Sequence, residues 1–529
     1  MEYHEAVNFL FDLRRFQVKP GTESIRRLLS HLGNPHEDVS FVQVAGSNGK
    51  GSTARMADAM LRESGAHVGL YTSPHFDDVR ERIRVDGRKV PKSALSAFVA
   101  EAKPYLVERA ADGEPLTFFE TVTALALWYF DRAGVDVAVL EVGMGGELDA
   151  TSAVDPVASA VTNVSLEHTA VLGDTVAEIA KTKAAVAPAD APLVTGATGE
   201  ALSVIREEAG DVLTVGDADS DADVRATYGG RVNHQEAAVT VETDAETLDV
   251  RIPLLGAYQA RNAGIAVSLA RQVRPDISEE AIHRGLRNAH WPGRFEVMGT
   301  EPTVVLDGAH NPDACAQVAT VLDEFDYDDL HLVYGAMHDK DHSEMVGALP
   351  EVASVVTCKA DISRGEDPEI LVVRLRATRW PRSRDRRRGR LGARPGARPC
   401  RLRRLRARRR LAVRRRRGSH DVDAGGRPEG PPHSRRRPPD PRPRERRRRR
   451  RPERAREAGG QPNGPHPCPA PTGPSAPRGT AVRRRRLRHL GPRVRRRTRR
   501  RGPDRDARPV RATDGGPRSP PVRARGRRS

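Results

Sequence analysis

The chain has 529 residues, of which 37% are hydrophobic, and a formal net charge of +18. A basic chain of this kind suggests nucleic-acid binding, but the positive charge is confined to one end. Residues 375–529 hold 56 Arg, no Lys and 11 Asp or Glu, so they carry +45 and residues 1–374 carry −27. An acidic, lysine-poor body is typical of salt-adapted cytoplasmic proteins, because a highly charged surface stays solvated in concentrated salt. An ordinary acidic protein is the alternative.

Residues 375–529 also lack Phe, Tyr, Ile and Met, and Arg, Pro, Gly and Ala dominate them. These four residue types have codons that can be written with G and C alone, which suggests a GC-rich gene read in a shifted frame. We predict that the segment is disordered, because too few large apolar side chains remain to offset chain entropy. A genuine basic tail that binds nucleic acid is the alternative.

The four cysteines, Cys315, Cys358, Cys400 and Cys468, form no CxxC pair and no metal-binding spacing. They indicate only a reducing compartment. We find no signal peptide and no apolar run of membrane-spanning length, so a cytoplasmic protein is expected. Residues 1–374 are long enough for two domains.

Strand and helix patterns alternate along these 374 residues. The first part predicts helices over 3–15, 23–32, 92–110, 117–133, 175–186, 258–272 and 279–289, and strands over 41–45, 67–71, 135–142, 156–164, 191–196 and, antiparallel, within 224–252. After a linker at 292–293, strands over 303–306, 330–334 and 353–358 alternate with helices after 311 and near 343–349. This order favours a doubly wound, mostly parallel α/β sheet and a smaller α/β domain. The predicted domains are 1–291, 292–374 and the disordered 375–529.

The stretch FVQVAGSNGKGST, residues 41–53, reads as a strand, a glycine turn and the start of a helix. Its glycines allow a ligand to approach the backbone closely, and the N–H groups of the helix start favour a phosphate. Lys50 supplies a charge for phosphate oxygens, and Ser52 or Thr53 a hydroxyl for Mg²⁺. Gly51 departs from the general P-loop pattern, in which Ser or Thr follows the lysine directly. A turn without a ligand is the alternative.

Several polar residues follow predicted strands, where ligands of open α/β sheets bind. Glu141 ends an apolar strand and suits Mg²⁺, and an ordinary strand-end carboxylate is the alternative. His168 follows another strand, and a structural histidine is the alternative. Asp307 and His310, in LDGAHNP, are either ligands or turn formers. Lys183, on a predicted helix, is by itself a solvated lysine.

Taken together, the segments AGSNGKGST, YTSPH, ERIRVDG, LTFFE, LEVGMGGELDATS, TNVSLEHTAVLGDT, GAYQARNA, GRFEV and LDGAHNPDA resemble one family in order and spacing. It is the folylpolyglutamate synthase/dihydrofolate synthase branch of the ATP-dependent Mur-type amide ligases. The resemblance covers about residues 1–370, and Gly51 is the variant typical of this branch. It implies a salt-adapted archaeal enzyme that adds L-glutamate to a folate or dihydropteroate carboxylate through an acyl phosphate.

The resemblance also implies roles for individual residues. The ATP site would comprise Gly46, Ser47, Asn48, Gly49, Lys50, Gly51, Ser52, Asn262, Arg294, Asp307 and His310. Ser52 and Glu141 would bind one Mg²⁺, and Ser73, Glu141 and His168 a second. Catalysis would depend on Lys50, Glu141, His168 and a carbamylated Lys183, and K⁺ is a further candidate cofactor. Thr117, Phe119, Asp149 and Ala150 would line the pterin pocket. The expected partners are small-molecule substrates, and the protein is expected to be a monomer.

This sequence departs from the family pattern at Glu147, Ser152, Ser165, Glu167 and Ala185. These departures concern the pterin side and the surroundings of the metal, not the reaction class. The alternatives are a cell-wall Mur ligase, a P-loop ATPase that needs no glutamate, and a nucleic-acid-binding protein. A fused dihydropteroate synthase domain, known from salt-adapted relatives, would be concealed by a shifted frame.

Overall fold

The computed structural model describes residues 1–17, 21–360, 362, 364–377, 390–392 and 411–413, which all lie in one compact unit, Met1–Gly425. Most of the predicted disordered segment, 375–529, therefore lies outside the described residues. Its described parts are the end of helix α13 (Pro368–Ala377) and two strands, β16 (Arg390–Gly392) and β17 (Leu411–Val413). For these short parts the secondary structure differs from the expected disorder.

An 11-stranded sheet forms the larger part of the described chain, in the order β11-β10-β9-β8-β7-β6-β1-β5-β2-β3-β4. Its centre is parallel: β1 (Ser40–Ala45), β2 (Val68–Tyr71), β5 (Val137–Glu141), β6 (Ala158–Val161), β7 (Leu193–Thr195) and β8 (Val212–Gly216). At one edge β3 (Ile83–Val85) and β4 (Arg88–Lys89) are added by antiparallel pairing. At the other edge β9 (Val224–Arg231) pairs in parallel with β8, and β10 (Ala237–Glu242) and β11 (Thr247–Ile252) follow by antiparallel pairing.

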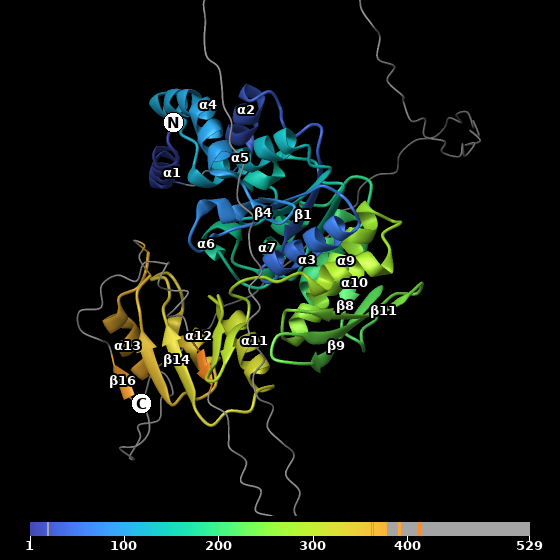
Figure 1. Ribbon diagram of the computed structural model, residues 1–529, viewed down its shortest axis with the longest axis vertical. Helices are drawn as coiled ribbons and strands as arrows, with labels where there is room; N and C mark the ends of the chain where they lie inside the picture. The colour runs from blue at the N-terminus through green and yellow to red at the C-terminus, as the bar shows by residue number, and fades with distance from the viewer. Residues whose placement is uncertain (18–20, 361, 363, 378–389, 393–410, 414–529) are drawn as a thin grey trace, which may run out of the picture. The chain divides into compact units, whose positions relative to one another are not determined.

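Helices cover both faces of this sheet (Figure 1). Alternate residues of β5 enter different cores, Val137 and Val139 one and Ala138 and Leu140 the other, which explains its nearly continuous apolar sequence. One face carries α3 (Lys50–Glu63), α9 (Ala257–Val273) and α10 (Glu279–Arg287); the other carries α1 (Tyr3–Asp12), α2 (Glu23–His31), α4 (Lys92–Ala111) and α5 (Phe118–Ala133). The short α6 (Thr169–Leu172), α7 (Val176–Ala184) and α8 (Gly199–Ala209) lie between later strands.

A second sheet follows in the order β12-β13-β17-β14-β15-β16. It contains β12 (Glu296–Thr300), β13 (Thr303–Leu306), β14 (Leu330–Tyr334) and β15 (Ser354–Thr357), and it is accompanied by α11 (Pro312–Leu322), α12 (His342–Gly347) and α13. Asn311 caps α11, because its side chain accepts a hydrogen bond from the N–H of Ala314, as expected for Asn before a helix that begins with Pro.

The predicted fold class is confirmed: a large, mostly parallel α/β sheet precedes a smaller α/β region. The predicted elements lie within a few residues of the observed ones. The prediction omitted α6, α8, α13, β8 and β12, and it did not identify the short β3–β4 pair. It also treated 224–252 as a separate antiparallel patch, whereas β9 pairs in parallel with β8 and extends the main sheet.

Candidate active site

The glycine-rich loop joins β1 to α3 in a conformation that only glycines accommodate at two positions. Gly46 and Gly49 have φ of 137° and 88°. A Cβ on Gly46 would lie 1.9 Å from Thr162 Oγ1, and one on Gly49 would lie 2.5 Å from Asn262 Oδ1. Lys50 Nζ donates to the carbonyls of Gly46 (2.8 Å) and Ser47 (3.1 Å). The loop therefore holds the lysine beside its own backbone, at the N-terminal end of α3 where a phosphate is favoured.

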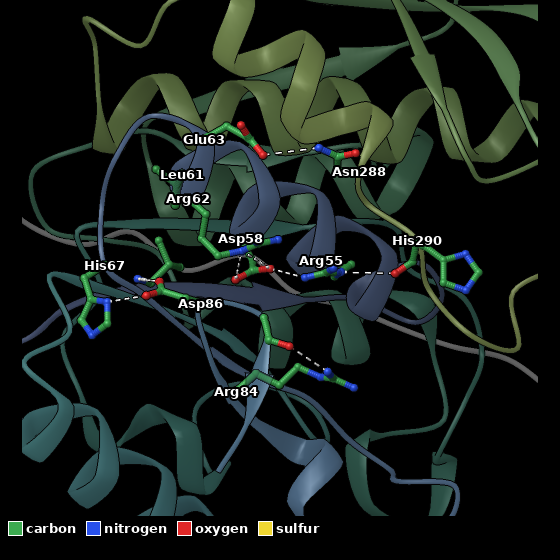
Figure 2. Close-up of polar contacts among 12 residues, drawn as sticks. Arg55, Asp58, Leu61, Arg62, Glu63, His67, Arg84, Asp86, Asn288 and His290 are labelled. Carbon is green, nitrogen blue, oxygen red and sulfur yellow. Dashed lines mark hydrogen bonds and ion pairs between the residues drawn. The ribbon is translucent and has the colours of Figure 1, made fainter. Parts of the chain in front are cut away.

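Helix α3 is anchored by a buried acid in its second half. Asp58 is fully buried and pairs with Arg55 and, at 3.3 Å, with Arg62. The Nε of Arg55 also donates to the carbonyl of His290 at 3.3 Å, just before the linker to the second sheet. Figure 2 shows these contacts running from α3 to His290. The helix that begins at the loop is thereby fixed to the segment that leads into the second sheet.

A cavity of about 470 Å³ opens above the loop and gathers most of the predicted site residues. This volume is within the range of small-molecule sites. The predicted residues that line it are Ser47, Asn48, Gly49, Lys50, Gly51, Ser52, Ser73, Glu141, His168, Asn262, Arg294, Asp307 and His310. Gly46, Thr117, Phe119, Asp149, Ala150 and Lys183 are not among its lining residues.

Glu141 lies at the carboxyl end of β5 and is 5% exposed. Its Oε2 accepts a hydrogen bond of 2.8 Å from the N–H of Ser73. Burial raises the pKa of Glu141, although the charge of Lys50 and the Ser73 N–H oppose this. Ser52 is buried on α3 and lines the same cavity, whereas His168 is exposed and has a left-handed φ of 49°. A carboxylate and hydroxyl oxygens form a donor set that suits Mg²⁺.

Lys183 and Glu167 form a buried ion pair behind the cavity wall. Lys183 Nζ lies 2.8 Å from Glu167 Oε1, and their side chains are only 2% and 11% exposed. Burial lowers the pKa of Lys183 to about 8, although Glu167 opposes the shift. Burial raises the pKa of Glu167, but the charges of Lys50 and Lys183 outweigh it and leave this pKa below its usual value. The solvated surface lysine considered as an alternative is therefore wrong for Lys183.

The second sheet brings Arg294, Asp307 and His310 to the same cavity. Asp307 follows β13, and its carboxylate accepts hydrogen bonds from the N–H groups of Phe295 (2.7 Å) and Ala309 (2.6 Å). The carboxylate thus fixes the turn that carries His310. Burial lowers the pKa of His310 to about 4, and the charge of Lys340 adds to this. His310 is therefore neutral near pH 7.

The predicted pterin-side residues form a group next to the glycine turn that follows β5. A Cβ on Gly143 would lie 2.4 Å from the Phe119 ring and 2.9 Å from Asp149 Oδ2. The side chain of Asp149 accepts from Thr151 N and Met144 N, and Thr117 forms a capping box with Glu120 at the start of α5. The side-chain oxygens of Asp149 and Thr117 therefore already accept hydrogen bonds from nearby residues. Gly143, which lies next to this group, lines the cavity.

Other residues lining the cavity were not predicted as site residues. They include Thr162, Asn163, Ser165 and Glu167 after β6, Tyr258 and Arg261 on α9, and Asp313 and Gln317 on α11. The motif TNVSLEHT contains the first four, so the strand end next to His168 was a usable signal. No sequence signal places α11 against the loop.

Groups of acidic, histidine and cysteine side chains suited to a metal ion are absent from the described part of the chain. No group of three or more His, Cys, Asp or Glu among these residues could hold a metal ion; the predicted magnesium ligands include only two such residues. Among the described helices, none is both long and apolar enough to cross a membrane.

Comparison with known proteins agrees with the fold. The Mur ligase middle domain matches residues 44–270, and the Mur ligase glutamate ligase domain matches residues 293–388. The P-loop sheet, the second α/β region and the cavity lined by both define a Mur-type ligase.

Full-length relatives narrow this class. A folylpolyglutamate synthase of Lacticaseibacillus casei is 36% identical over 372 residues, which are 67% of this chain and 85% of that protein. A solved FPGS–AMPPCP–folate complex is 34% identical, with a TM-score of 0.62 over 68% of this chain and 90% of the other. The chain belongs to the folylpolyglutamate synthase/dihydrofolate synthase family.

A haloarchaeal relative is more similar. A probable bifunctional folylpolyglutamate synthase/dihydropteroate synthase of Haloferax volcanii is 96% identical over 373 residues, which are 70% of this chain. The chain spans only 44% of that relative's length. The predicted relationship to proteins of salt-adapted archaea is confirmed.

Proposed function

We propose that this chain is an ATP-dependent amide ligase that joins L-glutamate to the carboxylate of dihydropteroate or a folate. One observation carries the proposal: the glycine-rich loop, the strand-end Glu141 and residues of the glutamate ligase region line a single cavity. We infer from the names of the relatives that the substrates are a pterin compound and glutamate. In the same proposal the protein is a monomeric enzyme of the reducing cytoplasm, and its substrates are small molecules.

The reaction needs an activated carboxylate, because a free carboxylate is a poor electrophile. Its oxygen attacks the γ-phosphorus of ATP, which gives an acyl phosphate and releases ADP. The neutral amine of glutamate then attacks the acyl carbon, an amide bond forms, and phosphate leaves with the bonding electrons. Positioning and charge stabilisation carry most of such a reaction, so no protein nucleophile is required.

The described residues suit these steps. The loop 46–52 would hold the phosphates of ATP, with Lys50 moving from its own backbone carbonyls to the phosphate oxygens. Asn262, Arg294, Asp307 and His310 would contact the nucleotide from α9 and the second sheet. Because burial holds the pKa of His310 at about 4, this ring can accept or donate a hydrogen bond without adding charge near pH 7.

Mg²⁺ fits the oxygen donors at this site. Ser52 and Glu141 would hold one ion, and Ser73, Glu141 and the ring nitrogen of His168 a second; when bound, the ions would neutralise phosphate charge. Lys183 is the candidate for carbamylation, because a buried amine with a lowered pKa is more often neutral and nucleophilic. A carbamate there would replace the cation with an anion. A role for K⁺ rests on the family resemblance alone.

The acceptor would enter beside the glycine turn 143–146. Phe119 offers a ring on which the acceptor can stack. The rest of the acceptor pocket would be formed by backbone groups and already hydrogen-bonded side chains of Thr117, Asp149 and Ala150. In this proposal residues 1–291 form the ATP-binding domain and residues 292–374 an incomplete glutamate ligase domain.

A second candidate function is a bifunctional enzyme that has lost its downstream part. The relative from Haloferax volcanii is named as such a protein, and this chain spans 44% of it. The aligned length of 373 residues nearly equals the acidic segment 1–374. A frame change after that segment would remove a dihydropteroate synthase domain from the product.

Product analysis tests the proposed function. The full chain is incubated in molar salt with ATP, Mg²⁺, L-glutamate and either dihydropteroate or tetrahydrofolate. We expect one acceptor to gain a glutamyl group, detected by mass spectrometry. Ligation of a UDP-linked cell-wall acceptor instead would favour the Mur alternative. Specific nucleic-acid binding that is lost with residues 375–529 would favour the basic-tail alternative.

A further inference from the structure

Helix α11 contacts the loop that is proposed to bind ATP through the residue that caps it. Asn311 Oδ1 accepts from the N–H of Ala314 at 2.8 Å, which is the capping bond. Its Nδ2 donates to Asn48 Oδ1 at 2.9 Å. The two ends of the Asn311 amide therefore have different roles: one starts the helix, and the other joins the helix to the loop.

The loop residue at this contact is itself held from the opposite side. The N–H of Asn48 donates to Asn163 Oδ1 at 2.8 Å, and its carbonyl accepts from Thr162 Oγ1 at 2.6 Å. Both partners follow β6. Since its backbone is fixed on the main sheet, Asn48 presents its side-chain oxygen to Asn311 as a defined docking point.

The far end of α11 is also attached to the first part of the chain. Just after the helix, the Glu324 carboxylate accepts from Tyr228 Oη at 2.9 Å, and the Glu324 carbonyl accepts from Arg231 Nη2 at 2.7 Å. The Arg231 guanidinium lies 4.2 Å from the centre of the Phe325 ring. With one end fixed on β9, the Asn48–Asn311 bond determines how the other end meets the loop.

We propose that Asn311 is a positioning residue, which aligns the start of α11 with the ATP loop through Asn48. Its neighbours His310 and Asp313 line the cavity, so the contact sets where these side chains stand relative to the loop. The inference rests on the proposed function for its kinetic consequence, but the contact itself does not depend on the identity of the acceptor.

A substitution that keeps the helix cap but loses the contact with Asn48 separates the two roles of Asn311. Serine caps helices about as well as asparagine, but its side chain is too short to reach Asn48 from this position. For N311S we expect kcat to fall roughly 3- to 10-fold, the range for one lost hydrogen bond. The melting temperature and the affinity for AMPPCP should stay close to wild type. N233S is the matched control, because Asn233 is exposed and makes only local turn contacts.

A double-mutant cycle with N48A decides whether the two residues act together. We expect N311S to lower kcat in the wild-type background and to add nothing in the N48A background. The proposal would be overturned if the effects of N311S and N48A on kcat were independent and multiplied. It would also be overturned if the kcat of N311S equalled that of wild type, or if N233S lowered kcat as much as N311S does. A fall in melting temperature that accounts for the lost kcat would overturn it too.

A second readout keeps the inference separate from the proposed function. Trp291 lies beside the loop, since its Nε1 is 3.1 Å from the position of a Cβ on Gly51. In the full chain carrying W128F and W380F, AMPPCP should change Trp291 fluorescence, and N311S should reduce that change. If wild type ligates no glutamate, the proposed function fails, and this signal still tests the contact: an unchanged amplitude in N311S would contradict it.

Discussion

Lys183 and Glu167 face each other at 2.8 Å, with the lysine side chain only 2% exposed. Glu167 lines the cavity, whereas Lys183 is not among its lining residues. Burial makes the charged form of this amine unfavourable, and the opposite charge of Glu167 only partly offsets the effect.

This pair predicts that bicarbonate activates the enzyme and that the activation grows with pH. A lysine is neutral above its pKa, and burial places that of Lys183 at about 8. The neutral amine can attack CO₂, form an N–C bond and lose a proton to give a carbamate. We expect the bicarbonate response to be small near pH 7 and large above pH 8, and ¹³C-bicarbonate NMR to detect the carbamate. K183R should lose the response, whereas K181R, at an exposed neighbour, should keep it; an equal response in both would contradict the assignment.

Glycine at position 49 is predicted to be essential for nucleotide binding. Gly49 and Gly65 both have left-handed φ, 88° and 87°, but only Gly49 is crowded, with Asn262 Oδ1 2.5 Å from the position of a Cβ. Alanine at Gly65 should cost about 1 kcal/mol of stability through backbone strain alone. G49A adds the clash with Asn262, so we expect at least a tenfold weaker affinity for AMPPCP by calorimetry. Similar affinities for the two variants would show that the loop tolerates a side chain there.

Asp58 is predicted to be a major contributor to the stability of α3. D58A leaves the guanidiniums of Arg55 and Arg62, which are only 15% and 21% exposed, without their shared carboxylate. Removing one partner of a buried ion pair typically costs about 3–5 kcal/mol, measurable by denaturant unfolding at constant salt. The control is E23A, because the Arg27–Glu23 pair is 50% and 72% exposed and water screens such a pair, so its removal should change stability little. Equal losses would refute the distinction.

The arginine-rich segment predicts a change of reading frame in the gene. All nine lysines precede residue 375, whereas 56 of the arginines follow it. DNA sequencing across codons 360–380 should reveal an inserted or deleted base relative to a continuous ligase frame. An uninterrupted frame confirmed on independent DNA would leave the tail as a genuine part of the protein.

Much of the fold and of the cavity lining could be predicted from sequence. The loop 46–52 and Glu141 were accessible because glycine turns and strand-end carboxylates are local signals with a physical cause. A helix after residue 311 was predicted, but the contact of Asn311 with Asn48 depends on packing between segments 263 residues apart. The burial of Lys183 was likewise hidden, because a lysine on a helix looks solvated until the neighbouring elements are in place.

The most direct test of the proposed ligase is phosphate release that depends on glutamate. The full chain in molar salt with ATP and Mg²⁺ is compared with K50A, and with K181A as an exposed lysine control. We predict that L-glutamate together with dihydropteroate or tetrahydrofolate releases phosphate in wild type and K181A, and that K50A is at least about 100-fold slower, since a charge that stabilises the transition state is lost. Phosphate release by wild type that is the same without glutamate, or that K50A retains, would contradict the account.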